Sequence, residues 1–283
     1  MDQGLGAWLV VGHGSVGAAL ARRLDDRGVR VFIYDPAPRV AITAGEQVDE
    51  HDLKHLSLVG AMSSVPPRHA LTAMGVIARA SIAEALVFDW NTLDPRVKRS
   101  MEEGLDGQLI DVALLDSLDR VGKDTFIAIS GSQVEAAARL LATLGFEVAI
   151  AGQACGDAAS VKLTRSLFMK SLEALVLEHV AITSRSPSRD IVRRSLERSL
   201  GNECVDFFDL LVRTNRLHAE RRAEELAEAI SLFENDFPGL IVAPAAAVLL
   251  EAVAAAWAEP GSPNSNASTL ELATFVRRRL HGE

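Results

Sequence analysis

The sequence lacks the residues on which several classes of protein depend. It has only two cysteines, Cys155 and Cys204, which are too few for a disulfide framework and have no metal-ligand spacing. Its seven histidines are scattered, and no H-E-x-x-H, C-x-x-C or G-x-S-x-G motif occurs. Positive charge is scarce, since the net charge is -9 and no lysine and arginine cluster precedes residue 185. We therefore expect no metal site, no hydrolase-type nucleophile and no nucleic-acid partner.

Signals for secretion or membrane insertion are also missing. The N-terminal stretch MDQGLGAWLVVG has an acid at Asp2 and no basic region, and its apolar run soon meets glycines. The longest apolar tract, 240–258, approaches transmembrane length but contains Pro244 and Glu251 and is mostly alanine. We predict that this tract is a buried helix and that the protein is cytoplasmic.

What the sequence does contain is a change of pattern near residue 155. Before it, short runs rich in β-branched residues alternate with helical segments, which predicts a parallel sheet with helices on both faces. After it, apolar residues recur at spacings of three and four, which predicts helices alone. The expected strands are AWLVV, VRVFIYD, LSLVGAM, EALVFDW, QLIDVAL, TFIAIS and FEVAIA. The expected helices include 18–26, 162–183, 217–233, one from an N-cap at Ser188 to Gly201, and a last one after a capping box of Ser268 and Glu271.

The motif GHGSVG follows the first expected strand and opens a helix. Gly12 would permit a tight turn, Gly14 would let a pyrophosphate approach the backbone, and Gly17 would let helix and strand close up. Unpaired N–H groups at the helix start would bind the phosphates. The alternative is a glycine turn that serves packing alone.

We predict a Rossmann-type dinucleotide-binding domain over 1–155 and an all-α substrate and dimerisation domain over 156–283. The predicted cofactor-binding residues of this loop are Gly12, His13, Gly14, Ser15, Val16 and Gly17.

An acid, Asp35, ends the next expected strand. Its carboxylate would accept hydrogen bonds from a ribose 2′-hydroxyl and repel a 2′-phosphate, which favours NAD over NADP. Arg39 weakens this inference because an arginine there could reach a 2′-phosphate, although it could equally be a solvated loop charge. We therefore expect NAD, with NADP as the alternative.

Several segments together resemble one family of proteins. They are GHGSVG, DWNTLDPRVK at 89–98, DVALLDS at 111–117, GDAASVK at 156–162 and HAERRAEELAE at 218–228. They resemble the β-hydroxyacid dehydrogenase family, which includes the 3-hydroxyisobutyrate dehydrogenases and belongs to the 6-phosphogluconate dehydrogenase clan. The likeness is strongest to a branch with a helical C-terminal domain of unknown function. It covers nearly the whole chain and implies an NAD(P)-dependent oxidoreductase acting on a hydroxy acid, semialdehyde or related carbonyl.

The family pattern G-x-G-x-x-x-K-x-x-x-N falls on the expected domain junction. Lys162 matches its lysine, which in the family is the general acid and base, whereas Ser166 stands where the family has asparagine. One helical turn separates the two residues, so the Ser166 hydroxyl could replace the amide in part. A cation near a helix N-terminus costs about 0.3 to 1 kcal/mol, which indicates a reason for Lys162 to be there. The alternative is an ordinary surface lysine.

The family's substrate loop, D-x-P-V-S-G-G, is only partly matched. Asp111 matches its aspartate, but Leu115, Asp116 and Ser117 replace its serine and two glycines. An aspartate there would repel a simple carboxylate, so we expect a larger, more apolar or differently charged substrate. In dimers of this clan the helical domain can complete the partner's site, so His218 and Arg222 could receive an acidic group. A solvated charged face is the alternative for these two.

Two further loops are expected at the carboxyl edge of the sheet, where such sheets bind ligands. DWNTLDP resembles the family segment that passes under the nicotinamide ribose, which makes Asn91 and Thr92 candidates for cofactor or substrate contact. Alternatively, Asp89 and Asn91 cap the turn before the proline. Met62 and Ser63 lie at the end of the expected strand LSLVGAM and are predicted to contact the cofactor, although Met62 could equally be packing.

Two rival functions stay open. Related folds reduce C=N bonds, so an imine reductase is one rival, although imine-reducing relatives usually lack the lysine. The other is a non-catalytic NAD(P)-binding protein, suggested by the altered substrate loop and by Ser166. A homodimer through the helical domain is also expected, because the tract 243–258 is too apolar to face water.

Overall fold

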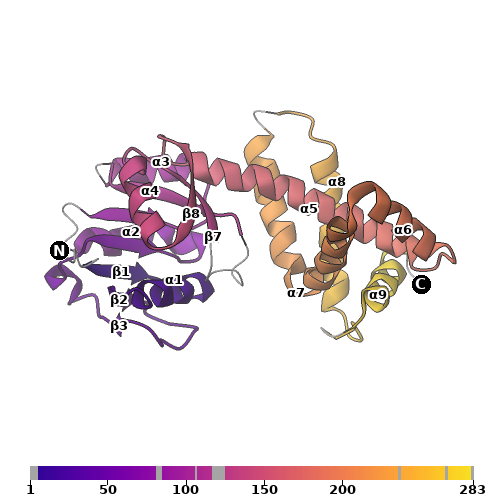
Figure 1. Cartoon of the computed structure of the whole chain (residues 1–283), viewed down its shortest axis with the longest axis horizontal. Helices are drawn as coiled ribbons and strands as arrows, with labels where there is room; N and C mark the ends of the chain where they lie inside the picture. The colour runs from indigo at the N-terminus through magenta and orange to yellow at the C-terminus, as the bar shows by residue number, and fades with distance from the viewer. Residues whose placement is uncertain are drawn as a thin grey trace. The chain divides into compact units, whose positions relative to one another are not determined.

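The computed structural model describes residues 6–80, 85–105, 107–116, 125–234, 237–264 and 267–281. The chain divides into two compact units, Met1–Lys162 and Leu163–Glu283, and each is described by itself (Figure 1). The first unit contains the sheet, and the second consists of helices. The predicted fold class, a Rossmann-type α/β part followed by an all-α part, is therefore confirmed.

In the described part of the chain, eight strands form one sheet in the order β3-β2-β1-β4-β5-β6-β7-β8. They are β1 (Ala7–Val11), β2 (Arg30–Tyr34), β3 (Glu46–Gln47), β4 (Gly60–Ser63), β5 (Leu86–Asp89), β6 (Leu109–Leu114), β7 (Thr125–Ser130) and β8 (Phe146–Gly152). All neighbouring strands pair in parallel except β6 and β7, which are antiparallel. The predicted parallel sheet is thus confirmed except at this one pair of strands. The connection 115–124 is shorter than the dozen or more residues that a parallel crossover requires.

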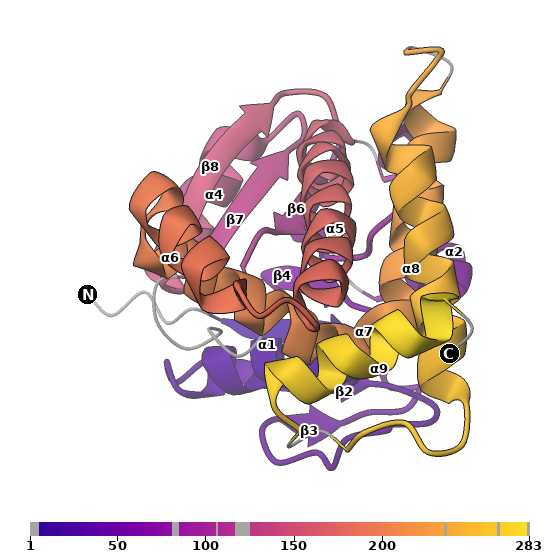
Figure 2. The same ribbon diagram turned by 90° about the vertical axis from the view of Figure 1, so that its right-hand side faces the viewer.

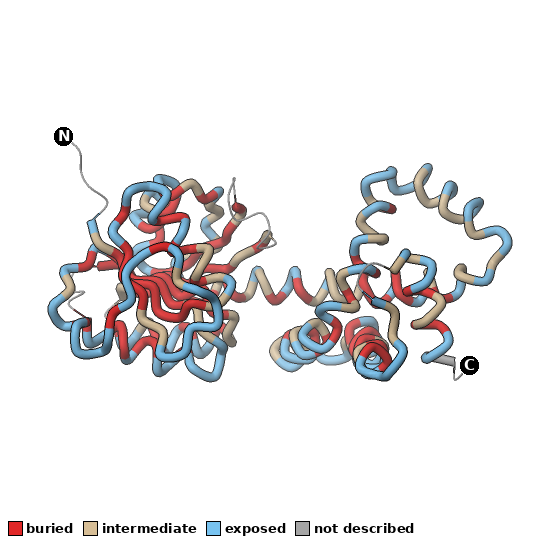
Figure 3. The backbone as a smooth tube through the Cα atoms, turned by 90° about the horizontal axis from the view of Figure 1, so that it is seen from below, coloured by how far each residue is buried: buried red, intermediate tan, exposed pale blue. Residues whose placement is uncertain are grey.

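Alternating side chains of β1 face opposite sides of the sheet. Trp8 and Val10 pack in one apolar cluster with residues of α1 (Ser15–Asp25) and α4 (Val134–Thr143). Leu9 and Val11 pack in a second cluster with residues of α2 (Ala70–Arg79) and α3 (Pro95–Glu103). The sheet is thus covered by helices on both faces, as predicted, and forms the buried layer of this unit (Figure 3). Short 3-10 helices lie at Leu53–His55 and Pro67–His69.

The second unit begins within α5 (Asp157–Thr183) and continues through α6 (Arg189–Leu200), α7 (Asn202–Phe233), α8 (Val242–Ala258) and α9 (Thr269–His281). Helices α7 and α8 lie side by side (Figure 2). The helix expected at 217–233 starts much earlier, directly after Gly201, because Val205, Leu211 and Val212 extend its buried face.

The apolar tract at 240–258 forms α8, which confirms the predicted buried helix. Ala243, Leu250, Val253 and Trp257 pack into the core of their own unit. Helix α7 and its neighbours cover one side of this helix. The exposed residues on the rest of it include Ala245, Val248, Ala252 and Ala255. The expectation that a second copy covers the tract therefore stays a prediction. Within the described residues, no helix is long and apolar enough to cross a membrane.

Candidate active site

The glycine loop follows β1 and leads into α1. Gly12 has a φ of +91°, which disfavours other residues, and a Cβ there would lie 2.2 Å from the Ser64 carbonyl oxygen. A Cβ on Gly17 would lie 1.9 Å from the carbonyl oxygen of Gly12, so strand, loop and helix approach as closely as predicted. A Cβ on Gly14, by contrast, would have no described atom within 4 Å. The fold does not require glycine at position 14, and the space beside it fits the close approach of a pyrophosphate.

The first turn of α1 is suited to an anion. No described side chain caps it and it contains no acidic residue, so its N–H groups are available to phosphate oxygens. Ser15 is exposed and Val16 is half-buried. His13 is buried, and its Nδ1 lies 3.2 Å from the Val40 carbonyl oxygen. The His13 side chain therefore packs toward the loop after β2, while its backbone belongs to the glycine loop.

Asp35 follows β2 and fixes the shape of this loop. Its Oδ2 accepts a hydrogen bond from the His13 amide at 2.6 Å, and its Oδ1 accepts one from the Ala37 amide at 2.8 Å. A carboxylate has about four acceptor positions. The half-exposed Asp35 can therefore keep these bonds and still accept one from a ribose hydroxyl. Arg39 is exposed.

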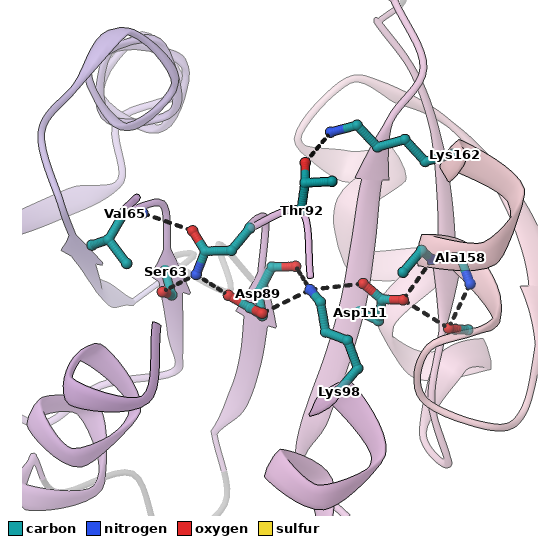
Figure 4. Close-up of polar contacts among 11 residues, drawn as sticks. Ser63, Val65, Asp89, Thr92, Lys98, Asp111, Ala158 and Lys162 are labelled. Atoms are coloured by element: carbon teal, nitrogen blue, oxygen red, sulfur yellow. Dashed lines mark hydrogen bonds and ion pairs between the residues drawn. The ribbon is translucent and has the colours of Figure 1, made fainter. Parts of the chain in front are cut away.

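Asn91 joins the ends of two parallel strands. Its Oδ1 accepts a hydrogen bond from the Val65 amide at 2.7 Å, and its Nδ2 donates to Ser63 Oγ at 2.9 Å and to Asp89 Oδ1 at 2.5 Å (Figure 4). The turn before Pro95 is capped instead by Asp94, which accepts from the Arg96 amide. The capping alternative for Asp89 and Asn91 was therefore wrong.

Met62 and Ser63 lie at the end of β4 and are fully buried. Met62 belongs to the apolar cluster of Trp8, so its side chain presents no exposed atom to a ligand. Ser63 is engaged by Asn91. Both residues support the carboxyl edge from within the fold.

Two candidates that are distant in sequence meet at this edge. Lys162, in the second turn of α5, donates a hydrogen bond from Nζ to Thr92 Oγ1 at 2.7 Å (Figure 4). Thr92 follows β5, and both residues are half-buried. The contact places the Lys162 ammonium at the carboxyl end of β5 within the first unit.

Lys98 was missed as a site residue. It lies on α3, is completely buried, and its Nζ contacts Asp89 Oδ2 at 2.7 Å and Asp111 Oδ1 at 2.8 Å. It also donates to the Asp89 carbonyl oxygen at 3.1 Å. The sequence indicates only weakly that Lys98 is buried. The lysine occupies the middle of a row of residues at i, i+3 spacing, between Pro95 and Met101, and all three are buried on α3.

The charges of this cluster influence one another. Burial raises the pKa of Asp89, although the Lys98 ammonium opposes that shift. Burial also disfavours the charged form of Lys98, but the carboxylates of Asp89 and Asp111 prevail and raise the pKa of the ammonium. Lys98 is therefore a stable buried cation between two acids.

Asp111 connects this cluster to α5. Its Oδ2 accepts a hydrogen bond from the Ala159 amide at 2.8 Å and lies 3.5 Å from the Ser130 hydroxyl. Ser130 Oγ in turn accepts from the Ala158 amide at 3.0 Å. The sheet thus supplies the acceptors that cap the helix carrying Lys162.

The predicted substrate loop has a structural use in the described residues. Asp116 Oδ2 accepts a hydrogen bond from the Phe126 amide at 2.9 Å, which ties the end of β6 to β7. Leu115 is buried in a small apolar cluster with Ala158. Ser117 lies outside the described residues.

In the helical unit, the remaining candidates form a polar network. Ser166 accepts a hydrogen bond from Lys170 Nζ at 2.8 Å, and Lys170 pairs with Glu225 at 2.7 Å. Arg222 pairs with the buried Glu173 at 2.5 Å, which the sequence did not predict.

His218 is exposed. Partial desolvation of its ring, together with the nearby Arg221 and Arg222 cations, lowers its pKa. Arg222 therefore has an acidic partner within its own unit. The same Glu173 carboxylate acts on His218, where it partly opposes the lowering of the pKa. Among the described residues, no group of histidine, cysteine and acidic side chains could hold a metal ion.

Comparison with known sequences gives one distant relative. No protein-family model matches the chain. An uncharacterized 28.5 kDa protein in the 7S RNA 5′ region of Methanothermus fervidus is 25% identical over 226 residues, which is 77% of this chain and 87% of that protein.

Solved structures are similar over most of their length. A conserved protein described as structurally similar to 3-hydroxyacid dehydrogenases is 24% identical, with a TM-score of 0.70 over 87% of this chain and 95% of its own. The 3-hydroxyisobutyrate dehydrogenase of Mycobacterium tuberculosis, solved with L-serine, is 13% identical, with a TM-score of 0.74 over 95% and 97%. An imine reductase of Myxococcus stipitatus, in complex with NAD+, is 17% identical, with a TM-score of 0.55 over 95% and 98%. The expected resemblance is confirmed at the level of the fold: this chain has the fold of the 3-hydroxyisobutyrate dehydrogenase-like proteins.

Proposed function

We propose that the chain is an NAD(P)-dependent oxidoreductase that interconverts a carbonyl and a hydroxyl group, with Lys162 as the general acid and base. The observation that carries this proposal is the hydrogen bond from Lys162 Nζ to Thr92 Oγ1, which holds an ammonium at the carboxyl edge of β5. Open α/β sheets bind ligands at that edge. Hydride transfer is the chemistry that a bound nicotinamide supplies.

The proton is the part of the reaction assigned to this chain. In reduction, Lys162 Nζ donates a proton to the oxygen that develops negative charge. In oxidation, the neutral amine accepts it from the hydroxyl. Thr92 keeps the amine in place through the cycle because its hydroxyl can both accept and donate a hydrogen bond.

The glycine loop and Asp35 support the cofactor assignment. The space beside Gly14 and the uncapped first turn of α1 fit a pyrophosphate. The half-exposed carboxylate of Asp35 favours a free ribose hydroxyl, so we propose NAD as the preferred form. NADP stays the alternative because of Arg39.

The substrate class is proposed as a hydroxy acid, semialdehyde or related carbonyl compound. We expect it to be larger, more apolar or differently charged than a small hydroxy acid, because Asp116 would repel a simple carboxylate. Imine reduction is the nearest rival. The fold matches the 3-hydroxyisobutyrate dehydrogenase with a TM-score of 0.74 and the imine reductase with 0.55. The presence of Lys162 also favours reduction of a carbonyl over reduction of an imine, because the alkoxide that forms from a carbonyl needs a proton donor.

The test combines cofactor binding with turnover. NADH and NADPH binding is titrated by fluorescence, and oxidation of either is followed with panels of semialdehydes, keto acids and imines. Lys162→Met should lower kcat by at least about a hundredfold, the usual size of an acid-base contribution, and should change the NADH Kd less than twofold. The matched control is Lys54→Met, which removes an exposed lysine of the same unit.

Each other outcome excludes a part of the proposal. An unchanged kcat in Lys162→Met would remove the lysine from the mechanism. Turnover restricted to imines would establish the rival reaction. Tight NADH binding without turnover across all panels would favour a non-catalytic binding protein.

A further inference from the structure

A continuous chain of polar contacts runs through the interior of the first unit (Figure 4). It begins at the Val65 amide, which lies beside the glycine loop, since a Cβ on Gly12 would lie 2.7 Å from Val65 Cγ1. From there it passes through the amide of Asn91 to the carboxylate of Asp89. This first half spans the carboxyl ends of β4 and β5.

Lys98 joins the first half to the second. Its ammonium contacts Asp89 on one side and Asp111 on the other, and Asp111 accepts the Ala159 amide at the start of α5. The three contacts of Nζ, to Asp89 Oδ2, the Asp89 carbonyl and Asp111 Oδ1, match the three N–H donors of an ammonium. Because β5 and β6 already pair at Asp89 and Asp111, Lys98 adds an ionic contact from α3 to the carboxyl ends of both strands.

The segment after β5 and the start of α5 carry the Thr92 and Lys162 pair. Thr92 directly follows Asn91, and Lys162 lies about one helical turn beyond Ala159. Each member of the pair therefore stands next to a residue that the buried chain holds. A shift of either segment would change the distance between Lys162 Nζ and Thr92 Oγ1.

We propose that Lys98 is a positioning residue, which aligns Lys162 with Thr92 by holding Asp89 and Asp111 together across the sheet edge. Its consequence for catalysis rests on the proposed function, but the alignment itself does not. Lys98 does not touch the reacting atoms, because its side chain is fully buried and engaged by the two carboxylates.

The charge count identifies a variant that should fold. Two acids surround one lysine, so Asp111→Asn leaves one balanced pair, Lys98 with Asp89, whereas loss of Lys98 would leave two buried carboxylates without a cation. An asparagine at 111 can still accept the Ala159 amide. What it loses is the ionic attraction to Lys98.

The first measurement is amide hydrogen exchange by NMR in the full chain. Asp111→Asn should speed exchange at least about fivefold at Ala159 and also at Val65, at the far end of the chain of contacts. The matched control is Asp157→Asn, which removes a carboxylate from the first turn of the same helix without touching Lys98. It should affect the start of α5 and the end of β8, against which Asp157 packs, and leave Val65 unchanged. Faster exchange at Ala159 without any change at Val65 would show that Asp111 is only a helix cap and would overturn the proposal.

The second measurement reports on Lys162 itself and needs no turnover. Acylation of lysines by a limiting reagent is read by mass spectrometry, with Lys54 as the internal reference. Asp111→Asn should change the Lys162 labelling rate at least about threefold, Thr92→Val should reproduce that change, and Asp157→Asn should not. An unchanged rate in Asp111→Asn would overturn the proposal even if the chain proves to be a dehydrogenase. If the chain turns over a carbonyl, Asp111→Asn should lower kcat about tenfold and leave the KM for NADH unchanged.

Discussion

Gly14 and Gly17 stand in the same loop but meet different surroundings. A methyl group at 17 would lie 1.9 Å from a carbonyl oxygen, so Gly17→Ala should destabilise the fold by about 1 to 3 kcal/mol or more. A methyl group at 14 would meet no described atom, so Gly14→Ala should change the free energy of unfolding by less than about 0.5 kcal/mol. It should nevertheless weaken NADH binding at least about tenfold, because the methyl group fills the space beside the pyrophosphate.

Urea unfolding and fluorescence titration measure the two effects on the same variants. Each glycine acts as the other's control, since one change should damage stability and the other binding. If Gly14→Ala binds NADH like the wild type, the pyrophosphate does not approach the loop at this position.

Cys155 has a measurable effect at alkaline pH. Burial raises the pKa of its thiol from 9.0 to about 12, and the Asp111 carboxylate adds to the shift. A raised pKa in the folded state means that the thiol contributes stability below pH 9 that is lost as the pH rises toward 12. At pH 11 the unfolded chain has released this proton and the folded chain has kept it, which costs about 2 to 3 kcal/mol.

Cys155→Ala removes this pH dependence. The free energy of unfolding is measured with urea for both proteins at pH 8 and pH 11. Between these pH values the wild type should lose about 2 kcal/mol more stability than the variant. Other titrating groups are common to both proteins and cancel. Parallel stability curves would mean that the thiol ionises as readily in the folded protein as in the unfolded chain.

At the scale of elements, Lys98 is the cation through which α3 contacts the paired ends of β5 and β6. Lys98→Met leaves the buried Asp89 and Asp111 without a cation, so it should destabilise the protein by about 3 to 5 kcal/mol. Lys54→Met, at an exposed lysine, should cost less than about 0.5 kcal/mol. Thermal and urea unfolding provide the comparison. Equal stabilities of the two variants would show that the ion pairs of Lys98 do not stabilise the fold.

The elements themselves were largely predictable, because hydrophobic periodicity is a local property. All seven expected strand runs contain a strand, and the capping box of Ser268 and Glu271 is present. Two errors came from partners that are not local. The pairing direction of β7 depends on the length of its connection, and the polar edge strand β3 exists only because β2 offers it hydrogen bonds.

The places of the glycines, Asp35 and Lys162 in the fold were predictable because they belong to motifs that follow strands or open helices. Their functional roles stay predictions. Lys98 was not predictable, because a lysine on a charged-looking helix is usually solvated, and only the fold brings two acids to it. The ion pair of Arg222 was not predictable for the same reason, since its partner Glu173 lies on another helix and only the fold brings the two together.

At the scale of the whole molecule, we propose that the chain forms a homodimer through α5. Phe168, Leu175 and Ile182 recur at a spacing of two helical turns on this helix and are 65%, 63% and 66% exposed. Such a row on one face is typical of a helix that packs against a partner. These residues add to the exposed side of the tract 243–258 as a reason to expect a dimer.

Light scattering at micromolar concentration should therefore give twice the mass of one chain. Phe168→Glu with Leu175→Glu should give monomers, because two charges would be buried at the contact. Leu71→Glu is the control, as Leu71 is 67% exposed on α2 of the other unit. A wild-type monomer, or a dimer that survives the double change, would exclude this surface.

The buried triad also has a consequence for the order in which the protein folds. Asp89, Lys98 and Asp111 all come from one β–α–β segment, residues 89–111, so their contacts are close in sequence and need no long loop to close. They can form before the second half of the chain has docked. We therefore expect α5 to meet a carboxylate acceptor that is already in place, so that the helix carrying Lys162 takes its register from the sheet as it folds.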